Sequence, residues 1–275
     1  MSLGDYWFGN EKSFYELERQ IDFALRGDVP AQIRSNSLDD YGENPVTMEV
    51  VENVGILNIT GGLMDKTNWF TRWLGIATYQ DIQEALIAAK DDTSVKTILM
   101  NWDSPGGMAK GCAKNAQFIR EFAEKVKPVH SFTEGMATSA ALWGYSAGLS
   151  HFADPDSEVG SIGVIAVHTE YTEMDAQMGI TRTIFRSAPY KALGGPYEKL
   201  SEESIQKIEE EIARLHGQFV SGVSELSGIP MTRMNSKIAT GKIFLANEAQ
   251  TLGLVDKVLS LGQVVRKLAR GAKPR

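Results

Sequence analysis

The segment EGMATSAALWGYSAG, residues 134–148, places the hydroxyl of Ser139 among small side chains. A serine that follows a strand and begins a helix presents its Oγ at the carboxyl edge of a sheet, where it can attack a carbonyl carbon. Small neighbours such as Gly135 and Ala140 would let a substrate approach. They would equally let a helix pack tightly against its neighbour, and the chain has no G-x-S-x-G pattern. The segment alone leaves a nucleophile and a tightly packed helix both open.

A serine nucleophile needs a proton acceptor. The histidines are His130, His151, His168 and His216. The first two fall in predicted strands and the last beside an apolar helix stripe, which leaves His168 as a spare candidate. A lysine can replace histidine if it is neutral, at a cost of roughly 4–5 kcal/mol that desolvation can supply. Lys191 lies among small and apolar residues in SAPYKALGGPY, but Lys110 and Lys199 also stay open.

A second segment, DSPGG at 103–107, follows a predicted buried strand. Its proline and paired glycines favour a tight turn. Such a turn can present backbone N–H groups next to a helix N-terminus, which are the parts of an oxyanion hole. The N–H groups of Gly107 and Ala140 would then point at the same oxygen. The plain alternative is a strand-to-helix turn that binds nothing.

Alternating elements must position these residues. Apolar periodicity predicts helices at 11–26, 109–126, 138–148, 171–178, 231–239, 246–252 and 260–270, with strands at 51–61, 95–102, 128–133, 150–154, 160–167 and 180–186. Thr78 and Asp81 predict the start of a further helix, and Ser201 that of a long one. The long helix carries an apolar stripe of Ile205, Ile208, Ile212, Leu215, Phe219, Val223 and Leu226. The alternation predicts an α/β domain with a largely parallel sheet.

Composition excludes several classes of protein. Net charge is −7 over 275 residues, which gives no electrostatic signature of nucleic-acid binding. The single cysteine, Cys112, excludes an internal disulfide, and no cofactor or metal is expected. No signal peptide or membrane-length apolar run is found, so we expect a cytoplasmic protein without a membrane anchor.

We expect two regions, a helical arm and linker over 1–47 and a main domain over 48–275. Residues 62–78 are rich in aromatic side chains and have no clear period. They would form an interface or the lining of a substrate groove, and the core of a single chain is the remaining alternative, which their clustering disfavours.

Four motifs in order resemble the signal peptide peptidase A family of serine proteases: DSPGG, MATSAALWGYSAG, EVGSIGVIAVHTEYTEMDAQMGI and SAPYKALGGPYEKLSEE. Within that family the match is closer to the head maturation (prohead) proteases of tailed phages and prophages. The likeness runs from about residue 50 to GKIFLANEAQTLGLVDKV at 241–258 and leaves out the N-terminal arm.

The resemblance implies a role for each matched residue. Ser139 corresponds to the nucleophile, Lys191 to the general base, and Ser161 of GSIGV to a serine that orients the base. Gly107 corresponds to the oxyanion turn, with the Ala140 N–H as second donor. The implied fold is the Clp protease/crotonase type, with stacked ββα units and added helices. A homo-oligomer is also implied, in which the base can reach the serine of a neighbouring subunit.

The implied function is a Ser–Lys endopeptidase that processes capsid or scaffold proteins during phage head maturation. A soluble peptidase of general peptide turnover is the alternative within the family. A Clp-type Ser–His–Asp peptidase is disfavoured, because the region about two dozen residues beyond Ser139 holds no histidine. A crotonase-like acyl-CoA enzyme and a non-catalytic shell protein are the alternatives from other classes.

Overall fold

The computed structural model describes residues 7–9, 42–188 and 190–271, with a larger sheet in the order β11-β10-β8-β6-β3-β2. Strand β9 pairs with β8, and β12 pairs with β9. The pairs are parallel except β2 with β3 and β10 with β11. The strands are β2 (Val46–Val51), β3 (Val54–Thr60), β6 (Thr97–Ser104), β8 (Val129–Thr138), β9 (His151–Ala153), β10 (Glu158–Gly160), β11 (Ile243–Leu245) and β12 (Lys257–Val258). The predicted α/β class with a mostly parallel sheet is confirmed.

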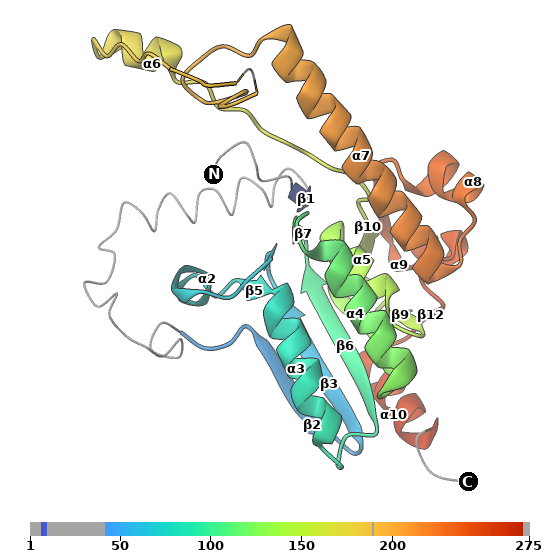
Figure 1. The fold of residues 1–275 in the computed structure, drawn as a ribbon. Coiled ribbons are helices and arrows are strands. Elements are labelled where there is room, and N and C mark those ends of the chain that lie inside the picture. Colours follow the sequence, from blue (N-terminus) through green and yellow to red (C-terminus); the bar gives the residue numbers. More distant parts are fainter. Residues whose placement is uncertain (1–6, 10–41, 189, 272–275) are drawn as a thin grey trace.

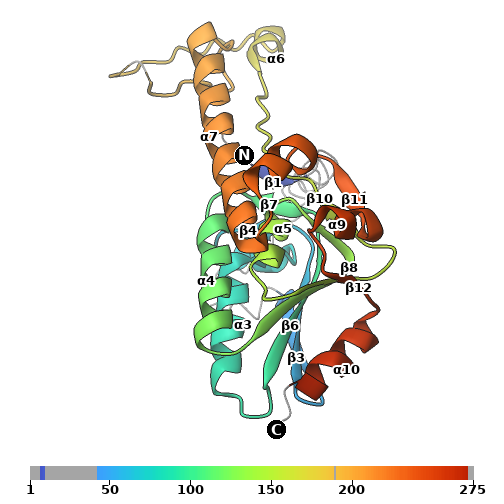
Figure 2. The ribbon, with the colours of Figure 1, turned by 90° about the vertical axis from the view of Figure 1, so that its right-hand side faces the viewer.

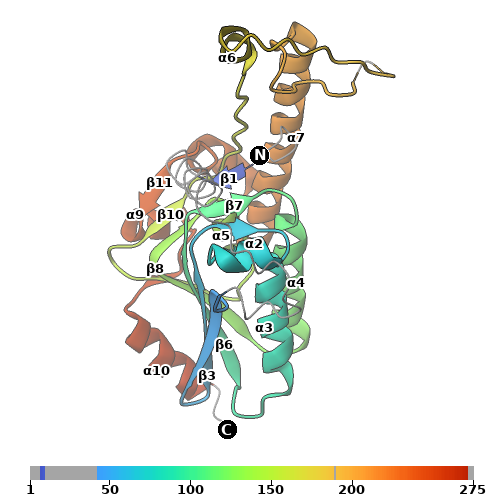
Figure 3. The same cartoon turned by 90° about the vertical axis from the view of Figure 1, so that its left-hand side faces the viewer.

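Helices cover both faces of this sheet (Figures 2 and 3). Helices α3 (Tyr79–Asp91) and α4 (Cys112–Lys125) lie on one face and α10 (Leu261–Gly271) on the other. Burial of apolar side chains on both faces holds the layers together. The α10 side of the core comprises Val54, Ile56, Leu99, Phe132, Phe152, Val264, Val265, Leu268 and Ala269.

A second, four-stranded sheet has the order β1-β7-β4-β5. Its strands are β1 (Trp7–Gly9), β4 (Leu63–Met64), β5 (Ala77–Thr78) and β7 (Gly106–Met108). The aromatic segment 62–78 supplies β4, β5 and the short helix α2 (Trp69–Trp73). It therefore belongs to the framework around the 103–107 turn, whose last two residues begin β7.

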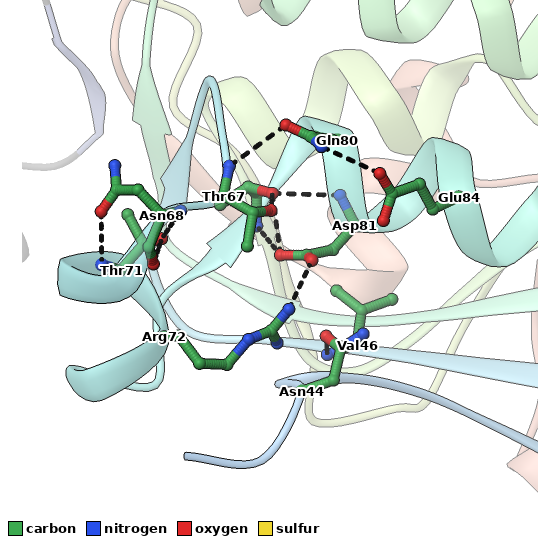
Figure 4. Close-up of polar contacts among 10 residues, drawn as sticks. Asn44, Val46, Thr67, Asn68, Thr71, Arg72, Gln80, Asp81 and Glu84 are labelled. Atoms are coloured by element: carbon green, nitrogen blue, oxygen red, sulfur yellow. Dashed lines mark hydrogen bonds and ion pairs between the residues drawn. The ribbon is translucent and has the colours of Figure 1, made fainter. Parts of the chain in front are cut away.

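The start of α3 is fixed by a buried polar cluster (Figure 4). Thr78 and Asp81 form the predicted capping box, each side chain accepting from the backbone N–H of the other. Asp81 also accepts from Arg72 Nη2 at 3.0 Å, and both side chains are buried. This ion pair ties α2 to α3 and so holds the smaller sheet against the larger one.

Two strand predictions are wrong, and one strand was not predicted. The predicted strand 51–61 is confirmed as β3, whereas β2, which pairs with it through a turn at Glu52 with φ of 59°, was missed. The predicted strand 160–167 is wrong, because β10 ends at Gly160 and Ser161 has φ of 59°. The predicted strand 180–186 is also wrong. No strand pairs with that segment among the described residues, and Arg182 instead forms an ion pair with Asp175.

The long helix α7 (Glu202–Ser227) begins after Ser201, as predicted, and extends away from the sheet (Figure 1). Its buried apolar residues, Phe219, Val220 and Val223, lie in the C-terminal half, whereas Ile205 is 41% exposed. The predicted apolar stripe is therefore buried only toward its C-terminal end, because the N-terminal half of α7 has no packed layer beside it in the described chain. Helix α6 (Thr172–Gln177) and the segment up to residue 200 lie at the same far end.

The remaining helices are α5 (Ala140–Ser146), α8 (Met231–Arg233), the π-helix η2 (Met234–Ile238) and α9 (Ala246–Leu252). The helices predicted at 109–126, 138–148, 171–178, 231–239, 246–252 and 260–270 are confirmed, with bounds that differ by at most three residues. The N-terminal helix at 11–26 and most of the linker to residue 47 lie outside the described residues. Within the part that is described, no helix combines the length and apolar content needed to span a bilayer.

Candidate active site

Ser139 stands between β8 and α5, where the chain passes from strand to helix. Its backbone has φ of 55° and ψ of −123°, a region that residues with a Cβ rarely adopt. The backbone N–H donates to Gly160 O at 2.8 Å, which fixes the junction to β10. The side chain is 0% exposed, and its Oγ has no hydrogen-bond partner. The strand–helix junction agrees with the predicted position of Ser139, whereas the burial of its hydroxyl differs from the exposed Oγ that was expected.

Ser161 lies beside Ser139 because of the strand register. Thr138 of β8 pairs with Gly160 of β10 in a parallel ladder, so the two serines occupy the next position on neighbouring strands. Ser161 is also buried, and its N–H donates to Lys242 O at 2.6 Å. The structure therefore brings together two of the three residues predicted to perform the chemistry.

The predicted oxyanion turn 103–107 joins the end of β6 to the start of β7, and Gly107 is held tightly within β7. Leu63 of β4 pairs with Gly107, and a Cβ on Gly107 would stand 2.0 Å from Leu63 O. Only glycine fits such a close approach. Helix α5, which starts with the buried Ala140, packs against β7. The predicted oxyanion residues thus come from adjoining elements, the strand β7 and the first turn of α5.

Two buried side chains link these elements. The hydroxyl of Tyr79, on α3, donates to Met108 O at 2.6 Å. The thiol of Cys112, at the start of α4, donates to Ala140 O at 3.6 Å. Burial raises the pKa of Cys112 to about 12 and that of Tyr79 well above its usual value, so both stay protonated donors. They connect β7 and α5 to the helical layer.

Lys191 is not brought to Ser139 within this chain. It lies exposed in a turn between α6 and α7, and its backbone N–H donates to Ala188 O. That segment stands at the far end of α7, away from α5 and β8 (Figures 1 and 2). Of the other lysines considered, Lys110 follows β7 and forms an exposed ion pair with Asp65, and Lys199 is exposed near the start of α7.

The histidines occupy different places. His130 in β8 and His151 in β9 flank a buried corner of the sheet, and burial lowers both pKa values. The Nδ1 atom of His151 also lies 3.7 Å from Asp256 Oδ2. His168, the spare base, lies on the extended segment after Ser161, and neither of its ring nitrogens has a hydrogen-bond partner.

A cavity opens beside Ser161, and sequence analysis did not anticipate it. Its volume is about 470 Å³, and its walls are the 161–165 segment, α7 and the 239–241 turn. His216, predicted to be structural, lines this cavity together with Ile212. The helical pattern places both residues on α7 but cannot show that this part of α7 faces Ser161. Among the described residues no group of histidine, cysteine or carboxylate side chains could hold a metal ion.

The chain is similar to several known proteins. The chain is 27% identical over 256 residues to the head-tail preconnector protein GP5 of Enterobacteria phage P21, covering 92% of this chain and 49% of that protein. It is 26% identical to capsid assembly protease C of Escherichia phage lambda, covering 81% of this chain and 50% of the relative. It is 26% identical to protease 4 of Haemophilus influenzae, covering 83% of this chain and 37% of that protein. The chain spans about half the length, or less, of these relatives.

The model of peptidase family S49 matches residues 121–275, more than half of the chain. The match includes Ser139, Ser161 and Lys191, whereas Gly107 precedes it. The family predicted from the four motifs is confirmed. The chain belongs to peptidase family S49.

Proposed function

We propose that this chain is a serine endopeptidase in which Ser139 attacks a peptide carbonyl and Lys191 is the general base. The observation that carries the proposal is the position of Ser139 at the strand–helix junction, with Ser161 at the next position on the neighbouring strand. A nucleophile held on a strained turn is already oriented, so orienting it costs little in the transition state. Membership of a peptidase family supports the same reaction.

Each step then has a group to perform it. A neutral Lys191 amine takes the proton from Ser139 Oγ as that oxygen bonds to the carbonyl carbon. The N–H groups of Gly107 and Ala140 stabilise the oxyanion of the tetrahedral intermediate. The lysine returns the proton to the leaving amine, and water then hydrolyses the acyl-enzyme by the reverse sequence of transfers. Ser161 orients the amine.

The amine has to come from a neighbouring subunit. The segment between α6 and α7 that carries Lys191 lies at the far end of α7 in its own chain, whereas Ser139 Oγ is buried without a partner. The cavity beside Ser161 is a route by which a lysine of a second copy reaches this serine pair. The segment around Lys191 also exposes large apolar side chains, with Phe185 at 92% and Tyr190 at 59%. Burying them between subunits would stabilise an oligomer.

We further propose a Clp/crotonase-like fold for residues 48–275 and a polypeptide substrate from phage head assembly. Support for the substrate comes from the relatives in phages P21 and lambda, whose names refer to the head-tail preconnector and to capsid assembly. The enzyme would act in the cytoplasm of the host cell. General peptide turnover is the second candidate, since protease 4 of H. influenzae is also similar.

Labelling with a fluorophosphonate tests the proposal. The reagent bonds covalently to an activated serine, and peptide mapping identifies which serine carries it. We expect one label, on Ser139, which Ser139→Ala removes. Ser146→Ala is the matched control, because Ser146 is also buried and ends the helix α5 that Ser139 caps. A protein of native fold in which Ser139 stays unlabelled in its oligomeric form would exclude the serine peptidase.

A further inference from the structure

The N-terminal strand β1 lies directly against the predicted oxyanion turn. It pairs antiparallel with β7, and Phe8 stands opposite Gly107, with Trp7 opposite Met108 and Gly9 opposite Gly106. Figures 1 and 2 show β1 next to β7, above α5. A segment far away in the sequence thus reaches the candidate active site through backbone pairing.

Pairing by β1 uses the remaining edge of β7. The other edge of β7 is taken by β4, through Leu63 and Gly107. An unpaired strand edge presents N–H and C=O groups that an extended peptide can pair with. Because α5 and Ser139 adjoin β7, a peptide added to this edge would run past the nucleophile. That position is the one β1 occupies.

Ser139 is closed off in the same structure. Its side chain is 0% exposed, and a substrate carbonyl must contact its Oγ for any reaction to occur. Something has to move before a polypeptide can bind. A three-residue strand makes few backbone hydrogen bonds, so β1 is easier to displace than the longer strands β3, β6 and β8 of the larger sheet.

We infer that β1 is an internal occupant of a peptide-binding edge on β7, and that it keeps the site closed until an extended polypeptide displaces it. The ligand class is a peptide in strand conformation, bound antiparallel to Gly106–Met108. The inference rests on the proposed function for its consequence in catalysis, but the binding edge itself requires no reaction. Since β1 belongs to the same chain, it competes at an effective concentration that can be on the order of 1 mM.

Binding can be measured separately from cleavage in a full-length chain that carries Ser139→Ala. The probe is a fluorescein-labelled peptide with the sequence of residues 4–12, GDYWFGNEK. In the test variant Trp7, Phe8 and Gly9 are each replaced by proline, which removes all three N–H donors of β1. In the matched control the same residues are replaced by alanine, which keeps the donors.

We expect the proline variant to bind the probe at least about tenfold more tightly than the alanine variant does. A probe whose own WFG is replaced by PPP should bind neither. Equal affinity of the two variants for the first probe would overturn the inference. If circular dichroism shows that the proline variant is unfolded, the chain lacking residues 1–9 is compared with the chain lacking residues 1–6, which retains β1.

The reactive enzyme separates this inference from the proposed function. With Ser139 intact, the proline variant should react with the fluorophosphonate faster than the alanine variant. If Ser139 is labelled at the same rate in the proline and alanine variants, and the two bind the probe equally, the role of β1 is rejected. The serine peptidase is still supported in that case, because Ser139 reacts. Displacement of β1 by the probe without any labelling of Ser139 would support the binding edge and reject the serine peptidase.

Discussion

Ser139 and Ser161 occupy equivalent positions on two neighbouring parallel strands. Each follows the last residue of its strand, and the register pairs those last residues, Thr138 and Gly160. Each has a positive φ, 55° for Ser139 and 59° for Ser161. Their backbones are also connected, since the N–H of Ser139 donates to Gly160 O. The pair is therefore fixed by the sheet, and a base entering beside Ser161 would meet Ser139.

Replacing Ser161 by alanine should lower kcat by roughly 10- to 100-fold and leave KM nearly unchanged, because an orienting hydroxyl is lost but the nucleophile and oxyanion donors remain. The decrease should be smaller than that caused by Ser139→Ala. Steady-state kinetics on an unfolded protein such as casein gives both constants. A Ser161→Ala enzyme with wild-type kcat would show that this hydroxyl does not orient the base.

The strained backbone at Ser139 leads to a prediction about stability. Ser139→Gly should be more stable than Ser139→Ala by about 1–2 kcal/mol, since glycine adopts φ of 55° and ψ of −123° without a Cβ. Both variants should lose at least about 10³-fold in activity. Urea unfolding monitored by tryptophan fluorescence measures the difference. If the two variants unfold at the same urea concentration, the backbone is not strained at this position.

Sharing of the site between subunits can be tested by complementation. Ser139→Ala and Lys191→Met should each be inactive alone, because one removes the nucleophile and the other the amine at nearly constant volume. Mixed after dissociation and reassembly, they should regain up to about a quarter of wild-type activity, since one site in four would combine an intact serine with an intact lysine. A mixture as inactive as its components would contradict a shared site.

The elements fixed by local patterns could be predicted from the sequence. Apolar periodicity identified the α/β class, and the capping residues Thr78 and Asp81 identified the start of α3. The position of Ser139 at a strand–helix junction followed from the same patterns. These features depend on residues close together in the chain, and such signals are the most reliable part of a sequence.

Features that depend on distant partners could not be predicted. The segment 160–167 has the composition of a strand, but the chain turns at Ser161, and nothing in a serine indicates a positive φ. The pairing of β1 with β7 joins Trp7–Gly9 to Gly106–Met108 without any local signal. The separation of the α6–α7 segment, which carries Lys191, from α5 likewise depends on the direction in which α7 leaves the sheet.

Gly107 should tolerate no side chain. A Cβ there would stand 2.0 Å from Leu63 O, so Gly107→Ala must force β4 and β7 apart and should cost at least about 2–3 kcal/mol of unfolding free energy. Gly217→Ala, inside α7 with no atom near the added methyl group, is the control and should gain up to about 1 kcal/mol. Urea denaturation of both variants measures the two effects. A Gly107→Ala protein as stable as wild type would contradict the close approach of β4.

The stability of the fold should depend on His130. Burial lowers the pKa of His130 from 6.5 to about 4, and neighbouring His151 and Lys267 contribute in the same direction. The folded state therefore favours the neutral ring. The contribution of neutral His130 to the free energy of unfolding is fully present above about pH 6.5 and is lost as the pH falls toward 4. The loss amounts to at most about 3 kcal/mol. Urea unfolding at intervals between pH 7 and pH 4 measures this loss. His130→Gln cannot titrate, so its unfolding free energy should fall less over the same range. A variant that loses as much stability as the wild type would show that other groups control the acid sensitivity, His151 with its lowered pKa first among them.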